Sequence, residues 1–258
     1  MMQKFLMTHD VATFECDRSN TMKFSAVLDL FQSAAGLHAD TLGCGWNYCL
    51  QTGHAWLAVA YHIQILQYPK MNEKITIRTW PSQKTRIKAT RDFEILDANG
   101  DIIIRASSQW VLINMDNKRL LNLLDVLPNL EKLEERAVDS DFNIEFDSSY
   151  IDLQKGFHVR FDDIDINQHT NNTLYPLWAT ESVPADFRVK NIVGEIVINF
   201  KSETFYGDAI EVLTKMDADN NFSSHSIKCQ DKECARISIV WKKNDTNVVL
   251  TRQRTETV

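Results

Sequence analysis

The two halves of the chain repeat one pattern, and this internal repeat constrains the fold more than any other feature of the sequence. Two isoleucines flank the string YPKMNEK in the first half, and two flank SETFYGDA in the second. The matching residues are 135 positions apart, Ile63 from Ile198 and Ile75 from Ile210. A repeat of this length indicates two copies of one folding unit.

Each copy is predicted to contain a helix followed by antiparallel strands. From Phe24 to His38 the apolar residues recur with helical spacing. Strands are then expected at 56–66, 74–80, 85–96 and 102–114. The second copy predicts a short strand at 157–161, a helix near 171–182, and strands at 194–201, 209–217, 223–229 and 234–242.

One helix wrapped by a bent antiparallel sheet is the hotdog unit. A lone unit leaves a sheet edge unpaired, so two units are expected to pair edge to edge. The predicted fold is therefore α+β, a tandem double hotdog. The N-terminal unit is assigned to residues 1–127 and the C-terminal unit to 150–258. Residues 128–149 are charged and contain Pro128, and they predict a linker with one or two helical turns.

Composition and the N-terminus narrow the class of protein. The formal net charge of −7 argues against a nucleic-acid partner held by general phosphate attraction. No apolar run approaches the roughly 18 residues that a membrane span needs. Residues 8–10 interrupt the apolar core that a signal peptide would have, so a cytoplasmic location is expected. Five cysteines without a CxxC pair predict reduced thiols, with no metal and no cofactor.

Polar groups are concentrated just before the second predicted helix. The segment FDDIDINQHTNN, residues 161–172, combines carboxylates, an imidazole and carboxamides. Asp, Asn and Thr are also the usual residues of turns and helix N-caps, so a purely structural explanation stands beside a catalytic one.

Comparison of the two copies favours the catalytic explanation. Aligning the two helices with an offset of 146 residues places Thr21 opposite Asn167 and Lys23 opposite His169. The first copy thus keeps the helix without the Asn and the His. Since groups needed only to begin the helix would be expected in both copies, the second copy is predicted to carry a functional site.

The string DIDINQHTNNTLYPLWATES resembles the signature region of the acyl-acyl-carrier-protein thioesterases, which are double-hotdog enzymes. The first half matches as well, in Tyr68-Pro69, in ITIRTW at 75–80 and in RASSQWV at 105–111. The resemblance covers nearly the whole chain. It implies hydrolysis of a fatty acyl thioester, with an acyl carrier protein as the partner.

The resemblance also implies a catalytic set, which is Asp165, Asn167 and His169 of the motif and Glu203 on a later strand. The match at Glu203 is weaker because the surrounding residues, NFKSET, depart from the family pattern. Thr204 stands where the family often has Cys, so a covalent cysteine mechanism at that position is excluded.

Hydrolysis of a thioester requires mainly an activated water and stabilisation of the oxyanion. Glu203 is the candidate general base, and His169 would orient the water or protonate the departing thiolate. Asp165 would set the imidazole tautomer, and Asn167 would donate an N–H or hold the water. Backbone N–H groups at residues 170–172 are the candidate oxyanion donors. Which residue takes the first proton is left open.

The first copy is free to hold the acyl chain. Candidate pocket residues come from segments predicted to face the interior between helix and sheet, although ordinary core packing is the alternative. They are Leu28, Phe31, Trp46, Trp56 and Leu57.

An acidic carrier protein requires a cationic dock on this acidic chain. Lys84, Arg86 and Lys88 alternate along a predicted strand and would share a face, with Arg91 on the opposite face. An ordinary solvated strand face is the alternative. The next candidates are Lys190, Lys201 and Arg188.

Three other functions compete with this interpretation. An acyl-CoA thioesterase would share the fold and the water chemistry. A hotdog dehydratase is disfavoured by the Asn-rich loop, and a fatty-acyl sensor would bind without hydrolysis. Chain-length preference and assembly into a homodimer stay open.

Overall fold

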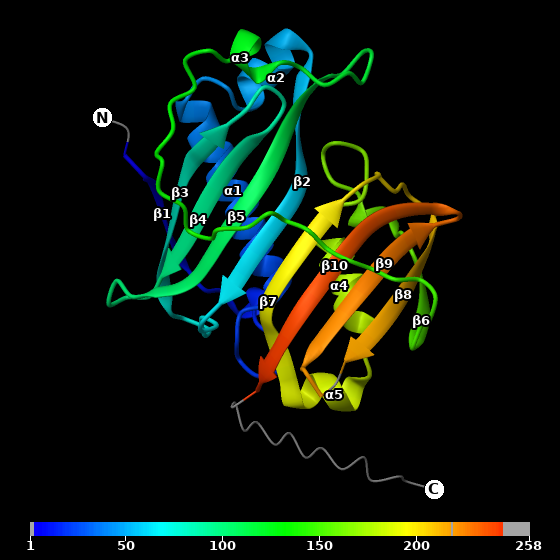
Figure 1. The fold of residues 1–258 in the computed structure, drawn as a ribbon. Helices are drawn as coiled ribbons and strands as arrows, with labels where there is room; N and C mark the ends of the chain where they lie inside the picture. Colours follow the sequence, from blue (N-terminus) through cyan, green and yellow to red (C-terminus); the bar gives the residue numbers. More distant parts are fainter. Residues whose placement is uncertain (1–2, 218, 245–258) are drawn as a thin grey trace, which may run out of the picture.

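The computed structural model describes residues 3–217 and 219–244, which form one ten-stranded antiparallel sheet (Figure 1). The strand order from edge to edge is β1-β3-β4-β5-β2-β7-β10-β9-β8-β6. The first five strands are β1 Phe5–Asp10, β2 His54–Ile65, β3 Lys74–Lys84, β4 Ala89–Leu96 and β5 Ile102–Asn114. The second five are β6 Leu153–His158, β7 Asn191–Phe200, β8 Ala209–Asp217, β9 Phe222–Cys229 and β10 Lys232–Lys243.

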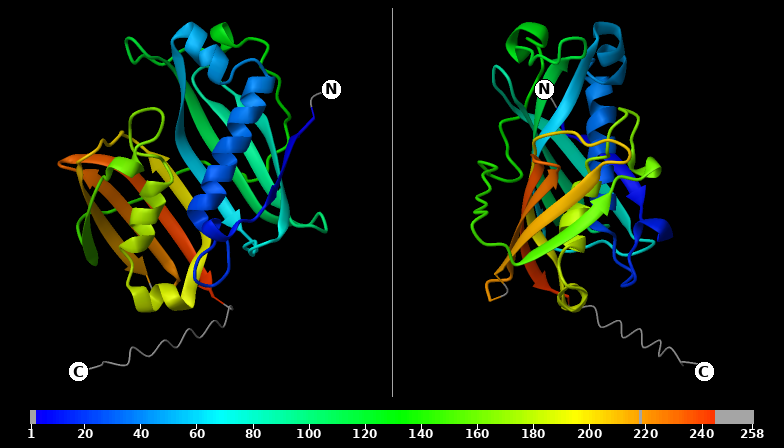
Figure 2. Two further views of the ribbon diagram at one scale, coloured as in Figure 1. Left: turned by 180° about the vertical axis from the view of Figure 1, so that it is seen from behind. Right: turned by 90° about the vertical axis from the view of Figure 1, so that its right-hand side faces the viewer.

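The central helices of the two copies, α1 and α4, lie on the same side of the sheet (Figure 2). Helix α1 has 18 residues and α4 has eight, and each lies against the strands of its own copy. The helices are α1 Phe24–Thr41, α2 Trp46–Thr52, α3 Leu123–Val126, α4 Leu174–Glu181 and α5 Ala185–Lys190. Two 3₁₀ turns occupy matching places before α1 and α4, at Thr13–Glu15 and Phe161–Asp163.

A pseudo-two-fold seam between β2 and β7 joins the two copies. Tyr61 pairs with Ile198 and Ile63 with Ile196 across this seam. Outward from it, the order β5, β4, β3, β1 on one side matches β10, β9, β8, β6 on the other. Both units therefore have the same strand order, and the predicted tandem double hotdog is confirmed.

The core lies between the helices and the inner face of the sheet. Leu28 and Phe31 of α1 are buried there, and the Phe31 ring packs 4.6 Å from that of Phe93. In the second copy Trp178 of α4 is buried against β-strand side chains, whereas Leu177 is 40% exposed. Leu177 thus lies at the accessible margin of the helix and not in the core.

The segment between the units is an extended strap and not a helical linker. It crosses the face of the sheet opposite to the helices (Figures 1 and 2). Leu133 N–H donates to Pro81 O at 2.9 Å, and Asn199 Nδ2 donates to Phe142 O at 2.8 Å. The helical turns expected at 128–149 are absent from this described segment, because its polar groups bond to the sheet instead.

Several element boundaries differ from the sequence prediction. The strand expected at 85–96 begins at Ala89, because residues 85–88 form the turn of the β3–β4 hairpin. Strand β1 was not predicted, although its side chains alternate between exposed and half-buried as an edge strand requires. Strand β6 ends at His158, where a strand at 157–161 was expected. No helix among the described residues is long and apolar enough to span a membrane.

Candidate active site

A tight loop between the second 3₁₀ turn and α4 carries the three motif residues. Asp165 N–H donates to His169 O at 2.9 Å, which closes the loop, and Gln168 has a left-handed φ of 70° at its tip. The Asp165 carboxylate accepts the Asn167 N–H at 2.8 Å and Asn167 Nδ2 at 3.2 Å. Asp165 therefore has the structural role expected of an Asp in a turn, and this turn places the Asn167 and His169 side chains close together.

The structure brings all four predicted catalytic residues together. His169 Nε2 lies 3.4 Å from Glu203 Oε1, and His169 Nδ1 lies 4.0 Å from Asp165 Oδ1. The second distance is too long for a hydrogen bond, so the imidazole tautomer is not set by Asp165 in this arrangement. The His169 side chain is 19% exposed and that of Glu203 is 47% exposed, so solvent can reach both.

A buried hydroxyl cluster, which the sequence analysis did not identify, holds this loop against the segment after β7. Thr204 Oγ1 donates to Thr170 Oγ1 at 2.7 Å, and Thr170 Oγ1 donates to Thr204 O at 3.0 Å. The Tyr175 hydroxyl lies 3.1 Å from Thr204 Oγ1. Burial raises the pKa of Tyr175 to about 12, so it stays a phenol. These hydrogen bonds between Thr204 and Thr170, the Thr204–Thr170 clamp, hold Glu203, one residue before Thr204, beside His169. The only sequence signal for it was that Thr204 replaces the family cysteine.

The backbone donors proposed for the oxyanion are largely occupied. Thr170 N–H donates to Thr204 O and Asn171 N–H donates to Asp163 O, both at 2.9 Å. In addition, α4 begins only at Leu174, later than expected, so these groups do not form the first turn of the helix. The prediction is therefore wrong for Thr170 and Asn171.

The loop before α1 follows the same backbone course as the loop that carries Asp165, Asn167 and His169. Asp17 N–H donates to Thr21 O at 2.8 Å, as Asp165 N–H donates to His169 O. An isolated β-bridge closes both loops at matching positions, and both have a left-handed residue before the bridge. These pairs are 148 residues apart, and not 146 as the spacing of the two helices predicts.

The corrected offset changes which residues correspond. Thr21 stands opposite His169 and Ser19 stands opposite Asn167, so the expected pairing of Lys23 with His169 is wrong. The reason is that α4 begins two residues later, relative to its loop, than α1 does. The first copy still has neither the Asn nor the His, so the functional asymmetry between the copies remains.

The predicted acyl-pocket residues do not form one group. Leu28 and Phe31 face the interior as expected. Trp46 begins α2 and is 50% exposed, which contradicts its predicted interior position. Trp56 donates its indole N–H to Cys44 O at 2.9 Å and packs in a separate small cluster near α2 and α3, while Leu57 is half-buried.

The basic residues Lys84, Arg86 and Lys88 lie around a hairpin turn and not along one strand face. Lys84 ends β3, and its ammonium donates to Leu127 O at 2.7 Å and to Pro128 O at 3.0 Å. Arg86 and Lys88 are exposed, and Lys88 Nζ donates to Gln109 Oε1 at 3.1 Å. The shared strand face is therefore wrong, although the three charges remain clustered.

Two related charge predictions can also be placed. Arg91 is buried, with its guanidinium 3.0 Å from His38 Nδ1, so it belongs to the interior. Among the reserve dock candidates, Arg188 pairs with Glu181, Lys201 pairs with Glu233, and Lys190 is exposed.

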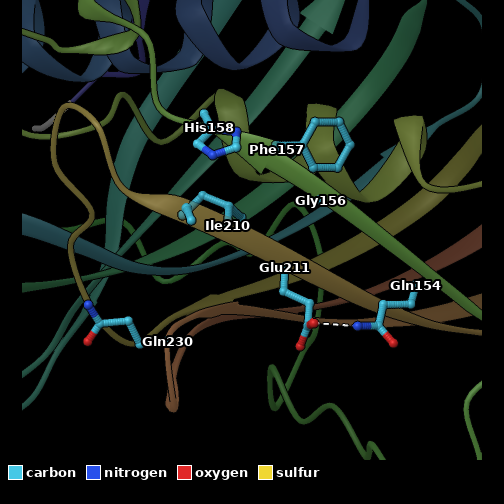
Figure 3. A pocket seen from close by; sticks show the side chains of 8 residues that line it. Gln154, Gly156, Phe157, His158, Ile210, Glu211 and Gln230 are labelled. Atoms are coloured by element: carbon cyan, nitrogen blue, oxygen red, sulfur yellow. Dashed lines mark hydrogen bonds between the residues drawn. The ribbon is translucent and has the colours of Figure 1, made fainter.

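A shallow hollow at the β6 edge of the sheet contains none of the predicted site residues (Figure 3). It has a volume of about 410 Å³ and is lined mainly by residues of β6 and β8, some polar and some apolar. Gln154 and Glu211 bond to each other across it, and His158 lies at its end. Its side chains therefore do not form part of the cluster around His169.

Comparison with known proteins identifies both halves. The model described as the acyl-ACP thioesterase N-terminal domain matches residues 2–129, and the C-terminal domain model of the same family matches 147–243. The chloroplastic oleoyl-acyl carrier protein thioesterase of Coriandrum sativum is 27% identical over 82% of this chain and 62% of its own length. The chloroplastic palmitoyl-acyl carrier protein thioesterase of Cuphea hookeriana is 26% identical over 83% of this chain and 55% of its own length.

Solved structures agree with the fold. A Lactobacillus plantarum protein described as an oleoyl thioesterase has a TM-score of 0.84 and 27% identity, over 93% of this chain and 96% of its own. The 12:0-ACP thioesterase of Umbellularia californica has a TM-score of 0.84 at 22% identity, over 93% of this chain and 98% of its own. The chain spans only 55–62% of the length of the two curated relatives above.

Proposed function

The chain belongs to the acyl-ACP thioesterase family, and from this membership we propose that it hydrolyses fatty acyl-acyl carrier protein to a free fatty acid and the carrier protein. The observation that carries the proposal is the cluster of His169, Asn167, Asp165 and Glu203. It occurs in only one of two loops that share a backbone course. A shared turn that carries the carboxamide and the imidazole in only one copy points to chemistry at that turn.

Glu203 is the proposed general base. As the water oxygen attacks the thioester carbonyl carbon, the Glu203 carboxylate takes a proton from that water. The resulting tetrahedral oxyanion collapses and breaks the C–S bond. His169, 3.4 Å from Glu203, carries the proton to the departing thiolate sulfur, so the products are a free thiol and a fatty acid. Exposure of Glu203 on the loop surface supports its access to water.

Asn167 is the proposed oxyanion donor. One hydrogen of its Nδ2 is directed to Asp165 at 3.2 Å, which orients the carboxamide and leaves the second hydrogen for a substrate oxygen. Asp165 acts through this contact and through its charge near the imidazole. The Thr204–Thr170 clamp supports the site by holding both segments in place.

The β3–β4 turn is the proposed carrier dock. Ala89 of β4, beside the turn, pairs with Trp110 of β5, and Trp110 pairs with Ala58 of β2. Two residues further along β2, Ala60 pairs with Asn199 of β7. The turn and the Glu203 segment thus lie at the same end of the sheet. They are three strand spacings apart, about 14 Å across the sheet. That separation suits a carrier that rests on one surface while its arm reaches another.

The decisive experiment is a hydrolysis panel of acyl-carrier-protein substrates across chain lengths, with matched acyl-CoA substrates alongside. Turnover of the carrier-bound series that Glu203→Gln abolishes is the expected result. Faster turnover of the matched acyl-CoA series would replace the carrier protein by CoA as the substrate. Binding of acyl chains with no turnover of either series would leave a sensor. The cytoplasmic location remains a prediction.

A further inference from the structure

The two copies are related by a pseudo-two-fold axis, so the first copy has a position equivalent to the site around His169 in the second copy. The residue after Tyr68 accepts a backbone hydrogen bond from the loop before α1 at 2.8 Å. The residue after Glu203 accepts the equivalent bond from the catalytic loop at 2.9 Å. Tyr68 is therefore the counterpart of Glu203, and it joins Ser19 and Thr21, which replace the Asn and the His.

This counterpart site is open. A cavity of about 520 Å³ lies where the loop before α1 meets α4, α5 and the start of β7, and Figure 2 shows these segments side by side. Its volume is within the usual range for sites that hold small molecules. The first copy therefore has an open pocket although it lacks the Asn, the His and the Glu of the second copy.

Cationic groups dominate the charge of the cavity wall. Arg18, Lys23 and Arg188 line it. Arg188 already pairs with Glu181. Among the described residues, neither Arg18 nor Lys23 pairs with a carboxylate, and the Lys23 ammonium donates to the Phe14 carbonyl at 2.9 Å.

Asp17 is the one acidic residue in the described lining, and its carboxylate is already engaged. Asp17 Oδ1 accepts the Ser19 N–H at 2.7 Å, the Thr21 N–H at 3.2 Å and the Thr21 hydroxyl at 3.0 Å. The cavity therefore offers two uncompensated cations to an anionic ligand group, in a chain whose net charge is −7.

A buried acceptor provides a second, independent sign of a ligand. Asn191 lines the cavity and is only 4% exposed. Its Nδ2 donates to Phe187 O at 2.9 Å, but its Oδ1 has no partner among the described residues. A buried carbonyl oxygen without a donor is costly. Because this oxygen has almost no accessible surface, a ligand amide would bond to it only after the Asn191 side chain turns towards the cavity.

Part of the remaining wall is apolar and accessible. Leu177 of α4 and Val189 of α5 line the cavity and are 40% and 48% exposed. Phe24 is half-buried and adds apolar surface, whereas Trp241 is 4% exposed and adds little. Apolar side chains left exposed in a hollow are typical of a binding site for a hydrophobic ligand.

We propose that this cavity binds a second acyl-phosphopantetheine thioester without hydrolysing it. The phosphate would lie against Arg18 and Lys23, an amide N–H of the arm would reach Asn191 Oδ1, and the acyl chain would lie along α4 and α5. The proposal rests on the proposed function, which makes such a thioester the substrate. One ligand thus accounts for the cations, the unpaired acceptor and the apolar wall.

The bound thioester would stay intact because neither a carboxylate nor an imidazole stands at the positions that correspond to Glu203 and His169. Ser19 and Thr21 supply only hydroxyls in place of the carboxamide and the imidazole. The Tyr68 hydroxyl donates to Val193 O at 3.1 Å, and burial raises its pKa far above neutrality. The site therefore retains the ligand where the catalytic site would cleave it.

The test is calorimetric titration with an acyl-phosphopantetheine thioether, in which a methylene replaces the thioester carbonyl. Unmodified protein is expected to bind at the cavity as well as at the catalytic loop. Arg18→Glu combined with Lys23→Glu should weaken one of these sites by about tenfold or more. Lys74→Glu with Lys232→Glu makes the same charge change on exposed strand ends and should leave binding unchanged.

Leu177→Trp is the second variant, because an already exposed side chain can be enlarged without disturbing the core, and it should block the cavity sterically. The proposal would be overturned if the Arg18→Glu/Lys23→Glu variant and the Leu177→Trp variant both bound the thioether as tightly as the Lys74→Glu/Lys232→Glu control. Free fatty acid of the same chain length lacks the phosphate and both amides, and equally tight binding of it at this site would refute the assignment of the arm. Hydrolysis is assayed separately, so a failed hydrolysis panel with an occupied cavity would refute the proposed function alone.

Discussion

Replacing Asn167 by alanine tests the catalytic interpretation against the structural one. The chain supplies a matched control at Asn99, because Asp97 and Asn99 form the same turn. Asn99 N–H donates to Asp97 Oδ1 at 2.9 Å and its Nδ2 donates to Asp97 Oδ2 at 3.3 Å. The corresponding distances at Asp165 and Asn167 are 2.8 and 3.2 Å. The two asparagines are exposed and differ mainly in what lies beside them.

The expected magnitudes follow from this equivalence. Each substitution keeps the backbone hydrogen bond and removes one exposed side-chain bond, so each should lower the free energy of unfolding by about 1 kcal/mol or less. If Asn167 stabilises the oxyanion, Asn167→Ala should in addition lower kcat about a hundredfold, equivalent to about 2.7 kcal/mol in the barrier. Asn99→Ala should leave kcat unchanged.

The assay compares steady-state hydrolysis of the best acyl-carrier-protein substrate by the two variants, with urea unfolding of both. Equal kcat values for Asn167→Ala and Asn99→Ala would refute the role of the carboxamide in catalysis. A much larger loss of stability in Asn167→Ala would show that the motif serves the fold.

Four further outcomes are expected. His169→Ala should lower kcat about a hundredfold, while His158→Ala, at an exposed histidine of the same unit, should not, and similar losses would remove the special status of the loop. Burial raises the pKa of all five cysteine thiols, so single Cys→Ser variants should stay active, and an inactive, correctly folded one would contradict the water mechanism. Arg86→Glu with Lys88→Glu should raise KM for the carrier-bound substrate and leave short acyl-CoA hydrolysis unchanged, as high salt should also do; an unchanged KM at low salt would place the dock elsewhere. Burial lowers the pKa of His225 to about 3, so this neutral histidine contributes stability above about pH 6.5 that is lost as the pH falls towards 3. Urea unfolding should show that loss, by up to about 1.4 kcal/mol per pH unit, and His225→Gln should reduce the slope; an unaltered slope would count against it.

Much of the fold could be predicted because it is encoded in residues close together in sequence. The spacing of apolar residues from Phe24 predicted α1, and alternation predicted most strands, since both depend on local periodicity. The repeat then predicted the double hotdog, because two units with the same pattern leave complementary edges. The three motif residues lie within five positions, so their proximity also followed from sequence.

Other features depend on contacts between distant segments, and only the tertiary structure decided them. Glu203 reaches His169 because Thr204 and Thr170, 34 residues apart, bond to each other in a buried cluster. The polar strap at 128–149 is extended because the sheet satisfies its hydrogen bonds, which no local propensity records. Trp46 is exposed although it is a large aromatic residue, because α2 lies at the end of the sheet.

The correspondence between the copies shows the division most clearly. The sequence alone determined that one copy has an Asn and a His that the other lacks, because residue identity is explicit in it. It could not place the two loops in register, since α4 begins two residues later than α1 relative to its loop, and hydrogen bonds between strand and loop set that register. The cavity beside the loop before α1 also depends on contacts between distant segments. Its walls come from both copies, and they meet only because β2 and β7 pair across the seam.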